Sequence, residues 1–197
     1  MLPLFVSNRL NALILTAAYL VWLVPEILRS FCRRPGSVTR AKDRFSGVIL
    51  VAGIWIGIEG GYYAAYDVRA LAIPWHRMLL FWMGILLMLA GVAFRWYSIR
   101  VLGKYFSVVI AIQPGHTVIE HGPYRYVRHP SYTGALLTIL GLGLVFGNLL
   151  SLLVLLFFAA LGYGYRIFVE EHILVEALGD AYRQYMKRTK RIIPFVI

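Results

Sequence analysis

Long apolar stretches take up most of this 197-residue chain. Three of them, residues 10–28, 45–66 and 78–94, come close to the roughly 20 residues that a helix needs to cross a membrane. The fourth, residues 133–169, is too long for one crossing, and Gly147-Asn148 near its middle is a turn signal. We therefore predict an all-α integral membrane protein with five transmembrane helices, of which the last two form a helical hairpin.

The amino-acid composition agrees with this fold class and limits the kinds of binding partner that we expect. The chain is 60% hydrophobic and 15% charged, whereas soluble domains carry about 25% charged residues. In a membrane protein, a net charge of +11 indicates contact with anionic lipid, so membrane lipids and no nucleic acid are the expected partners. The single cysteine, Cys32, excludes an internal disulfide, and no Cys/His spacing predicts a metal site.

The placement of basic residues predicts the topology of a single membrane domain, residues 1–197. Its parts are three N-terminal spans (1–102), a polar segment (103–132), the hairpin (133–169) and a polar C-terminal tail (170–197). If the loop after the first span is cytoplasmic, 17 of the 20 basic residues lie on that side, and only Arg9, Arg69 and Arg77 lie opposite. The N-terminus is then outside, and the polar segment and the tail face the cytosol. Apolar residues at helical spacing from Ala177 to Tyr185 also predict a helix in the tail.

Two clusters are candidates for chemistry. Residues 122–134 gather Arg, His and Tyr at the mouth of a span, and Pro130 disfavours helix at His129, so the chain should turn there. These residues suit either membrane anchors or a site. Arg166 and Glu170 are four residues apart and share a helix face, which suits either a surface ion pair or a site at the membrane boundary. Glu59, the acid deep in the second span, is expected to have a structural role.

These clusters, taken together, resemble the isoprenylcysteine carboxyl methyltransferase family. Order and spacing match over roughly 80 residues, and the first 100 match only as generic spans. The matching pieces are His116-Thr-Val-Ile119, Gly122-Pro-Tyr124, Arg128-His-Pro-Ser-Tyr132, Arg166 with Glu170-Glu171, Gly179-x-x-Tyr182, and a basic tail ending Pro194-Phe195. The five-span plan is similar to that of the compact prokaryotic members of this family.

The resemblance implies a methyltransferase that uses S-adenosylmethionine, releases S-adenosylhomocysteine, and acts on a lipophilic small molecule or lipidated substrate at the membrane–cytosol interface. It assigns Arg166 and Glu170 to catalysis. It assigns the following residues to cofactor binding: Gln113, His116, Thr117, Val118, Ile119, Tyr124, His129, Pro130, Ser131, Tyr132 and Glu170. Tyr124 and Tyr132 suit a sulfonium, and Arg128 suits the carboxylate of the cofactor.

The acceptor stays open at this point. A carboxylate is favoured, because it is already ionised at pH 7 and needs no general base. A phospholipid amine is the first alternative, since it must lose a proton, a role that would fall to Glu170 or His129. A sterol-type reductase that binds NADPH is a second alternative from another enzyme class. A small membrane scaffold or transporter subunit is a third, although no inverted repeat supports transport.

Overall fold

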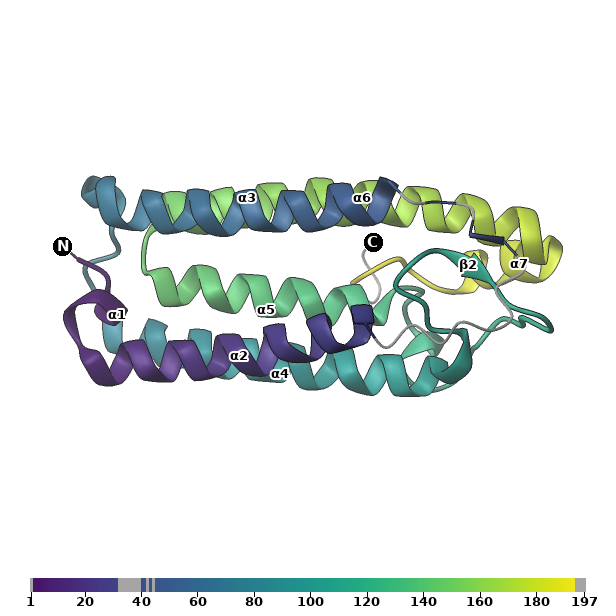
Figure 1. The fold of residues 1–197 in the computed structure, drawn as a ribbon, viewed down its shortest axis with the longest axis horizontal. Coiled ribbons are helices and arrows are strands. Elements are labelled where there is room, and N and C mark those ends of the chain that lie inside the picture. The colour runs from purple at the N-terminus through teal and green to yellow at the C-terminus, as the bar shows by residue number, and fades with distance from the viewer. Residues whose placement is uncertain (1, 32–39, 42, 44, 194–197) are drawn as a thin grey trace.

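The computed structural model describes residues 2–31, 40, 41, 43 and 45–193. Five long helices form the body of the molecule (Figure 1): α2 (Arg9–Phe31), α3 (Phe45–Asp67), α4 (Arg77–Leu102), α5 (Pro130–Phe146) and α6 (Leu149–Leu178). The shorter elements are α1 (Leu4–Ser7), η1 (Arg69–Leu71), η2 (Gly103–Tyr105), η3 (Gly122–Arg125), α7 (Asp180–Arg188) and the strands β1 (Arg40–Ala41) and β2 (Ala111–Ile112). The strands form one antiparallel pair, with Arg40 opposite Ile112.

The five long helices run along the long axis of the molecule in a layered bundle. In Figure 1, α3 and α6 lie together on one side, α5 lies in the middle, and α2 and α4 lie on the other side. The closest pairings are α4 with α5 and α3 with α6. The segment that contains β2 gathers with α7 at one end of the bundle. This end holds the candidate site described below.

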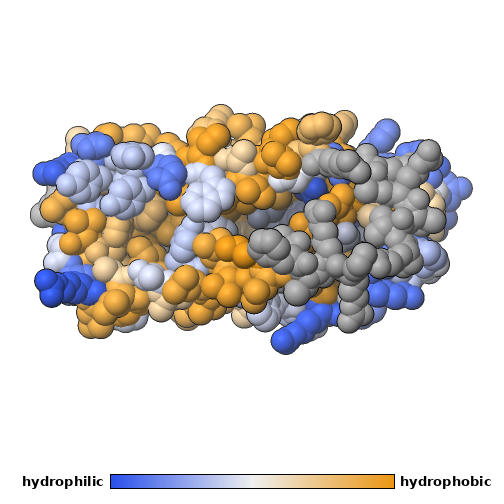
Figure 2. Space-filling model, in the orientation of Figure 1, coloured by the Kyte–Doolittle hydropathy of each residue, from blue (hydrophilic) through white to orange (hydrophobic). Residues whose placement is uncertain are grey.

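Four of the helices are long and apolar enough to cross a membrane: α2, α3, α4 and α6. Helix α5 is also apolar, but its 17 residues extend only about 26 Å at 1.5 Å per residue. Figure 2 shows hydrophobic residues over the middle of the molecule and hydrophilic residues at both ends. The predicted fold class, an all-α integral membrane protein, is confirmed, with α5 shorter than the other four.

The turn between α5 and α6 lies where the sequence predicts it. Gly147 ends α5 in the left-handed region (φ 62°), and Asn148 caps α6 by accepting from the backbone N–H groups of Leu150 (2.9 Å) and Ser151 (3.2 Å). The Asn148 amide also donates to the carbonyl of Val68 at 2.9 Å. A buried helix start must satisfy its free N–H groups, and this side chain satisfies two of them.

Glycines allow α4 and α5 to approach each other closely. A Cβ on Gly84 would lie 2.6 Å from the carbonyl oxygen of Gly141, and one on Gly91 would lie 2.6 Å from that of Gly134. The two contacts are two helical turns apart on each helix, so the backbones touch along a continuous seam. Gly141 therefore has a packing role, and the seam determines the position of α5.

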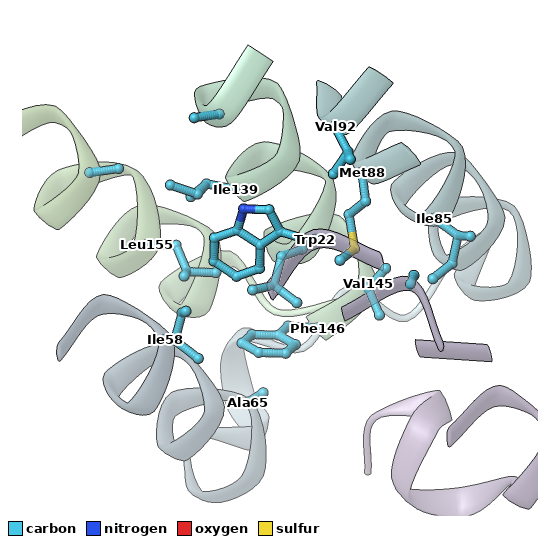
Figure 3. Close-up of a cluster of buried hydrophobic side chains, with 14 of the residues drawn as sticks. Trp22, Ile58, Ala65, Ile85, Met88, Val92, Ile139, Val145, Phe146 and Leu155 are labelled. Atoms are coloured by element: carbon cyan, nitrogen blue, oxygen red, sulfur yellow. The ribbon is translucent and has the colours of Figure 1, made fainter. Parts of the chain in front are cut away.

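Helix α2 closes the bundle over this seam. Its Trp22 lies among buried side chains of several other helices, including Ile58, Ile139 and Leu155 (Figure 3). Nearer the site, Glu26 accepts two hydrogen bonds from Arg95 of α4, at 2.7 and 3.0 Å, and Arg95 also donates to the carbonyl of Ser131 at 3.1 Å. This partly buried pair joins α2 and α4 to the beginning of α5.

The boundary of the last span differs from the prediction. Helix α6 continues to Leu178, so Glu170 and Glu171 belong to it and not to a separate tail. The rise in polarity after residue 169 does not end the helix, because Ile173 remains buried against the body. Gly179 (φ 58°) ends it, and the helix predicted through Ala177 and Tyr185 is two helices, α6 and α7.

Two other predictions concern residues of the N-terminal half and the tail. Glu59 is exposed on α3, and the close contacts of that helix with α6 are made by Gly57 and Gly61. Cys32 and the Pro194-Phe195 end of the tail lie outside the described residues.

The glycine seam leads to a stability prediction. Gly84→Ala places a methyl group against the α5 backbone, and overpacking of this kind costs about 1–3 kcal/mol. We expect the variant to unfold at a lower temperature than the parent protein in the same detergent. Gly164→Ala is the matched control, because a Cβ there meets nothing within 4 Å. Equal melting temperatures for the two variants would contradict the proposed role of the seam.

Candidate active site

The candidate site is a cavity at the end of the bundle where the segment between α4 and α5 meets α6 and α7. It encloses about 810 Å³ of non-atom space, including its open mouth. The wall includes apolar residues, among them Leu102, Phe106, Ile110 and Leu174, and the polar residues described below.

Ten of the twelve residues that the sequence assigns to the site line this one cavity: His116, Thr117, Val118, Ile119, Tyr124, His129, Ser131, Tyr132, Arg166 and Glu170. Gln113 and Pro130 do not line it. Gln113 begins a tight turn, in which its carbonyl accepts from the N–H of His116 at 3.1 Å. Pro130 is buried as the first residue of α5, where a missing N–H costs nothing.

His116 presents a free nitrogen to the cavity. Its ring stacks on Tyr105 with centroids 4.5 Å apart and planes 7° apart. Its Nδ1 atom is buried and has no hydrogen-bond partner among the described residues. Burial lowers the pKa of the imidazole, although the negative charge of Glu170 opposes the shift. His116 is therefore neutral near pH 7 and has one nitrogen available to a ligand.

Tyr124 presents a second free polar atom. It lies in η3, its side chain is 5% exposed, and its hydroxyl is buried with no partner among the described residues. Burial raises the pKa of this phenol, and the charge of Glu170 raises it further. The hydroxyl therefore stays protonated. Buried polar groups are rarely left without a partner, so an orphaned atom at a cavity wall indicates a ligand that supplies one.

A hydrogen-bonded chain connects the two residues assigned to catalysis. The Tyr132 hydroxyl donates to Glu170 Oε2 at 2.6 Å, and Arg166 Nε lies 3.4 Å from the same hydroxyl. Arg166 and Glu170 thus meet through Tyr132 and not as the direct surface ion pair that their spacing also allows. Arg166 is only 4% exposed, so its charge requires buried partners.

The remaining donors of Arg166 are held by residues from outside the predicted site. Nη1 donates to Ser46 Oγ at 2.9 Å, and Nη2 donates to the carbonyl of Val108 at 2.7 Å. Asp43 lies 3.8 Å from Nη1. Partial burial of Asp43 opposes ionisation, but hydrogen bonds from Ser46 and Phe45 and the charge of Arg166 together lower the pKa of its carboxyl group. Asp43 and Ser46, at the start of α3, and the carbonyl of Val108 therefore hold the guanidinium of Arg166 in one position.

Glu171 points to a different set of partners. Its Oε1 accepts from Arg128 Nε at 2.7 Å and lies 3.2 Å from His129 Nε2, and its Oε2 accepts from Arg191 Nε at 3.1 Å. Arg128 also lines the cavity while Glu171 holds its Nε, and the expectation that it meets the carboxylate of a cofactor stays a prediction. Its other hydrogen bonds go to the carbonyls of Met186 and Thr189.

Several residues that shape the site were not predicted from the sequence. Asp43, Ser46 and Glu171 act through contacts that join parts of the chain far apart in sequence, and Tyr105 stacks on His116 within the polar segment. Glu171 follows Glu170 directly, and successive residues of a helix point about 100° apart, so one of the two acids had to face away from the cavity. The sequence does not say which one.

The family comparison matches the part of the chain that builds this cavity. Residues 83–176 match the model of the isoprenylcysteine carboxyl methyltransferase family. This segment is slightly less than half of the chain, and over it the chain is similar to that family. The segment includes most of α4, the whole polar segment, α5 and nearly all of α6, and therefore every residue that the sequence assigns to the site.

Individual relatives carry the corresponding name. The protein-S-isoprenylcysteine O-methyltransferase of Schizosaccharomyces pombe is 36% identical over 96 residues, which are 48% of this chain and 41% of that protein. That of Saccharomyces cerevisiae is 31% identical over 116 residues, covering 58% of this chain and 48% of that protein. A probable enzyme of the same name from Oryza sativa subsp. indica is 29% identical over 117 residues, which are 58% of this chain and 61% of that protein. The matches thus span about two fifths to three fifths of these relatives.

The fold comparison extends beyond the matched segment. A solved structure of the eukaryotic intramembrane Ras methyltransferase, isoprenylcysteine carboxyl methyltransferase, superposes with a TM-score of 0.60 over 91% of this chain and 60% of its own. Because the sequence identity is only 21%, this likeness is evidence for a shared fold alone. The N-terminal helices, whose sequence matches the family only as generic spans, therefore share the arrangement of that structure.

The lowered pKa of His116 predicts the direction of a pH effect. The unfolded chain protonates this imidazole as the pH falls through about 6.5, and the folded chain does so only at lower pH. The stability that depends on neutral His116 is thus present above that pH and is lost below it. Between pH 7.5 and 5.5, the free energy of unfolding should fall more for the parent protein than for His116→Gln, which cannot titrate. Identical losses would contradict burial of a neutral imidazole.

Proposed function

We propose that this chain transfers a methyl group from S-adenosylmethionine to a lipophilic substrate at the membrane surface, with a carboxylate as acceptor. One observation carries the proposal: residues with the family's motif, drawn from three separate segments, line one cavity at the end of a membrane bundle. The names of the relatives support carboxylate O-methylation over the amine and reductase alternatives.

The cavity wall fits the polar parts of this cofactor. Nδ1 of His116 and the Tyr124 hydroxyl lack partners among the described residues, and would bind the amino-acid or ribose part of the cofactor. Glu170 keeps one carboxylate oxygen beyond its bond to Tyr132 and would accept from a ribose hydroxyl or the ammonium group. The rings of Tyr124 and Tyr132 can stabilise a nearby cation by about 0.5–2 kcal/mol.

S-adenosylmethionine, when bound, supplies the electrophilic methyl group. A carboxylate acceptor needs no base, since it is ionised at pH 7. The protein then contributes alignment and exclusion of water. Arg166 would orient the acceptor oxygen. Its anchoring by Ser46, Val108 and Asp43 keeps the guanidinium in one place, which is what an aligning group requires.

The same proposal includes the orientation in the membrane. Basic residues are concentrated at the end of the bundle that carries the cavity, and Arg9, Arg69 and Arg77 lie towards the other end. By the positive-inside rule the cavity faces the cytosol and the N-terminus lies outside. A soluble cofactor then enters from the cytosol, while a lipophilic acceptor reaches the same cavity from the bilayer.

Cofactor binding tests the proposal first. S-adenosylhomocysteine titrated by calorimetry into the detergent-purified protein should bind saturably, and Glu170→Gln should weaken binding about tenfold, equivalent to about 1.4 kcal/mol. Asp180→Asn is the matched control, since it removes one carboxylate on the exposed surface of α7. NADPH is titrated in parallel. Binding of NADPH without S-adenosylhomocysteine would transfer the chain to the reductase class.

The acceptor is tested by transfer of labelled methyl groups. A prenylated cysteine with a free carboxylate should be methylated, whereas its amide and phosphatidylethanolamine should not. Arg166→Lys keeps the charge but loses the planar donor set. It should reduce turnover about a hundredfold or more, as loss of an aligning contact can, and leave the affinity for S-adenosylhomocysteine within a few-fold of the parent. Methylation of the amine at a rate that rises with pH would favour the phospholipid alternative.

A further inference from the structure

The C-terminal strap, residues 189–193, runs beside residues 126–133 after α7 ends. Val127 and Lys190 form a parallel bridge. The backbone N–H of Arg128 donates to the carbonyl of Lys190 at 2.8 Å, and that of His129 donates to the carbonyl of Arg191 at 2.9 Å. The strap therefore satisfies backbone groups just before α5, and buried N–H groups without such partners would be costly.

The strap also holds the first turn of α5. The Thr133 hydroxyl donates to the carbonyl of Ile192 at 2.7 Å. On the neighbouring positions, His129 and Tyr132 line the cavity, and their rings stack with centroids 5.5 Å apart and planes 9° apart. The strap lines no part of the cavity itself, yet it supports the backbone from which these two rings project.

Glu171 joins the strap to the same wall by charge. Its side chain is only 5% exposed, and it accepts from Arg128 and Arg191 while contacting His129. A carboxylate at this depth requires such compensation. The two adjacent acids of α6 therefore have separate tasks: Glu170 faces the cavity, and Glu171 connects the wall behind it to the strap.

We propose that the strap and Glu171 are positioning elements for the cofactor site, and that the Arg191–Glu171 pair determines how tightly the site binds its cofactor. Without the pair, the strap separates more readily from residues 126–133, and His129 and Tyr132 lose their fixed orientation. Affinity then falls, since the wall must be ordered when the ligand binds. The predicted loss of affinity rests on the proposed function, whereas the predicted loss of order in residues 126–133 does not.

The test uses variants in the full chain that leave the cavity lining unchanged. Arg191→Gln removes the charge at the strap, and Thr133→Val removes the bond to Ile192 with little change in shape. Arg188→Gln is the matched control, because this arginine is similarly exposed but pairs with Glu120 on the surface. Arg191→Lys restores the charge and serves as the rescue variant.

Two measurements are made on each variant. In ligand-free protein, Arg191→Gln and Thr133→Val should raise amide hydrogen exchange in residues 126–133 about tenfold, while Arg188→Gln matches the parent. By calorimetry, Arg191→Gln should weaken S-adenosylhomocysteine binding about three- to tenfold. Arg191→Lys should come within about twofold of the parent. The melting temperature without ligand should be the same for Arg191→Gln and Arg188→Gln, which separates positioning from general stabilisation.

The outcomes are distinguishable. Raised exchange with unchanged affinity overturns the positioning role. Unchanged exchange in both Arg191→Gln and Thr133→Val overturns the strap as an ordering element, whatever the affinities. If the parent protein binds no S-adenosylhomocysteine, the proposed function fails, and the exchange measurement alone decides whether the strap orders the wall.

Discussion

Backbone contact between α4 and α5 is the interaction on which the rest of the structure depends. At Gly84–Gly141 and Gly91–Gly134 the two helices approach more closely than any side chain would allow. In a bilayer, helices gain no hydrophobic energy by leaving lipid for one another, so close packing of this kind is a main source of association. The seam also determines where α5 begins, and therefore where His129 and Tyr132 stand relative to α6.

The cavity combines two kinds of support at the end of this bundle. Helices α5 and α6 provide rigid walls, and the polar segment before α5 provides the turn that carries His116 and the short helix η3 that carries Tyr124. Each buried charge in the walls has a compensating partner from a distant part of the chain: Asp43 for Arg166, and Arg128 and Arg191 for Glu171. Fixed donors and acceptors around a partly apolar cavity suit a reaction that depends on alignment.

Sequence reasoning succeeded where the signal was local. Apolar length predicted the helices, Gly147-Asn148 predicted the hairpin turn, and Pro130 predicted the break at His129. It failed at the end of α6, because polarity changes at Glu170 while the buried face continues to Ile173 and the helix ends only at Gly179. It also did not reveal the pairing of Arg128 with Glu171, since the sequence does not show which acid an arginine will meet.

Local sequence patterns were enough to establish the membrane class, the approximate spans and the set of residues from which a family-like site could be built. They could do so because the bilayer imposes a fixed helix length and because each motif is a short run of the sequence. The packing of the chain establishes which polar atoms have no partner among the described residues, as at His116 and Tyr124, and which charges are already paired, as at Arg166 and Glu171. These outcomes depend on contacts such as Ser46 with Arg166 and Glu171 with Arg191. Such pairings are set by how the helices pack, and no local pattern encodes them.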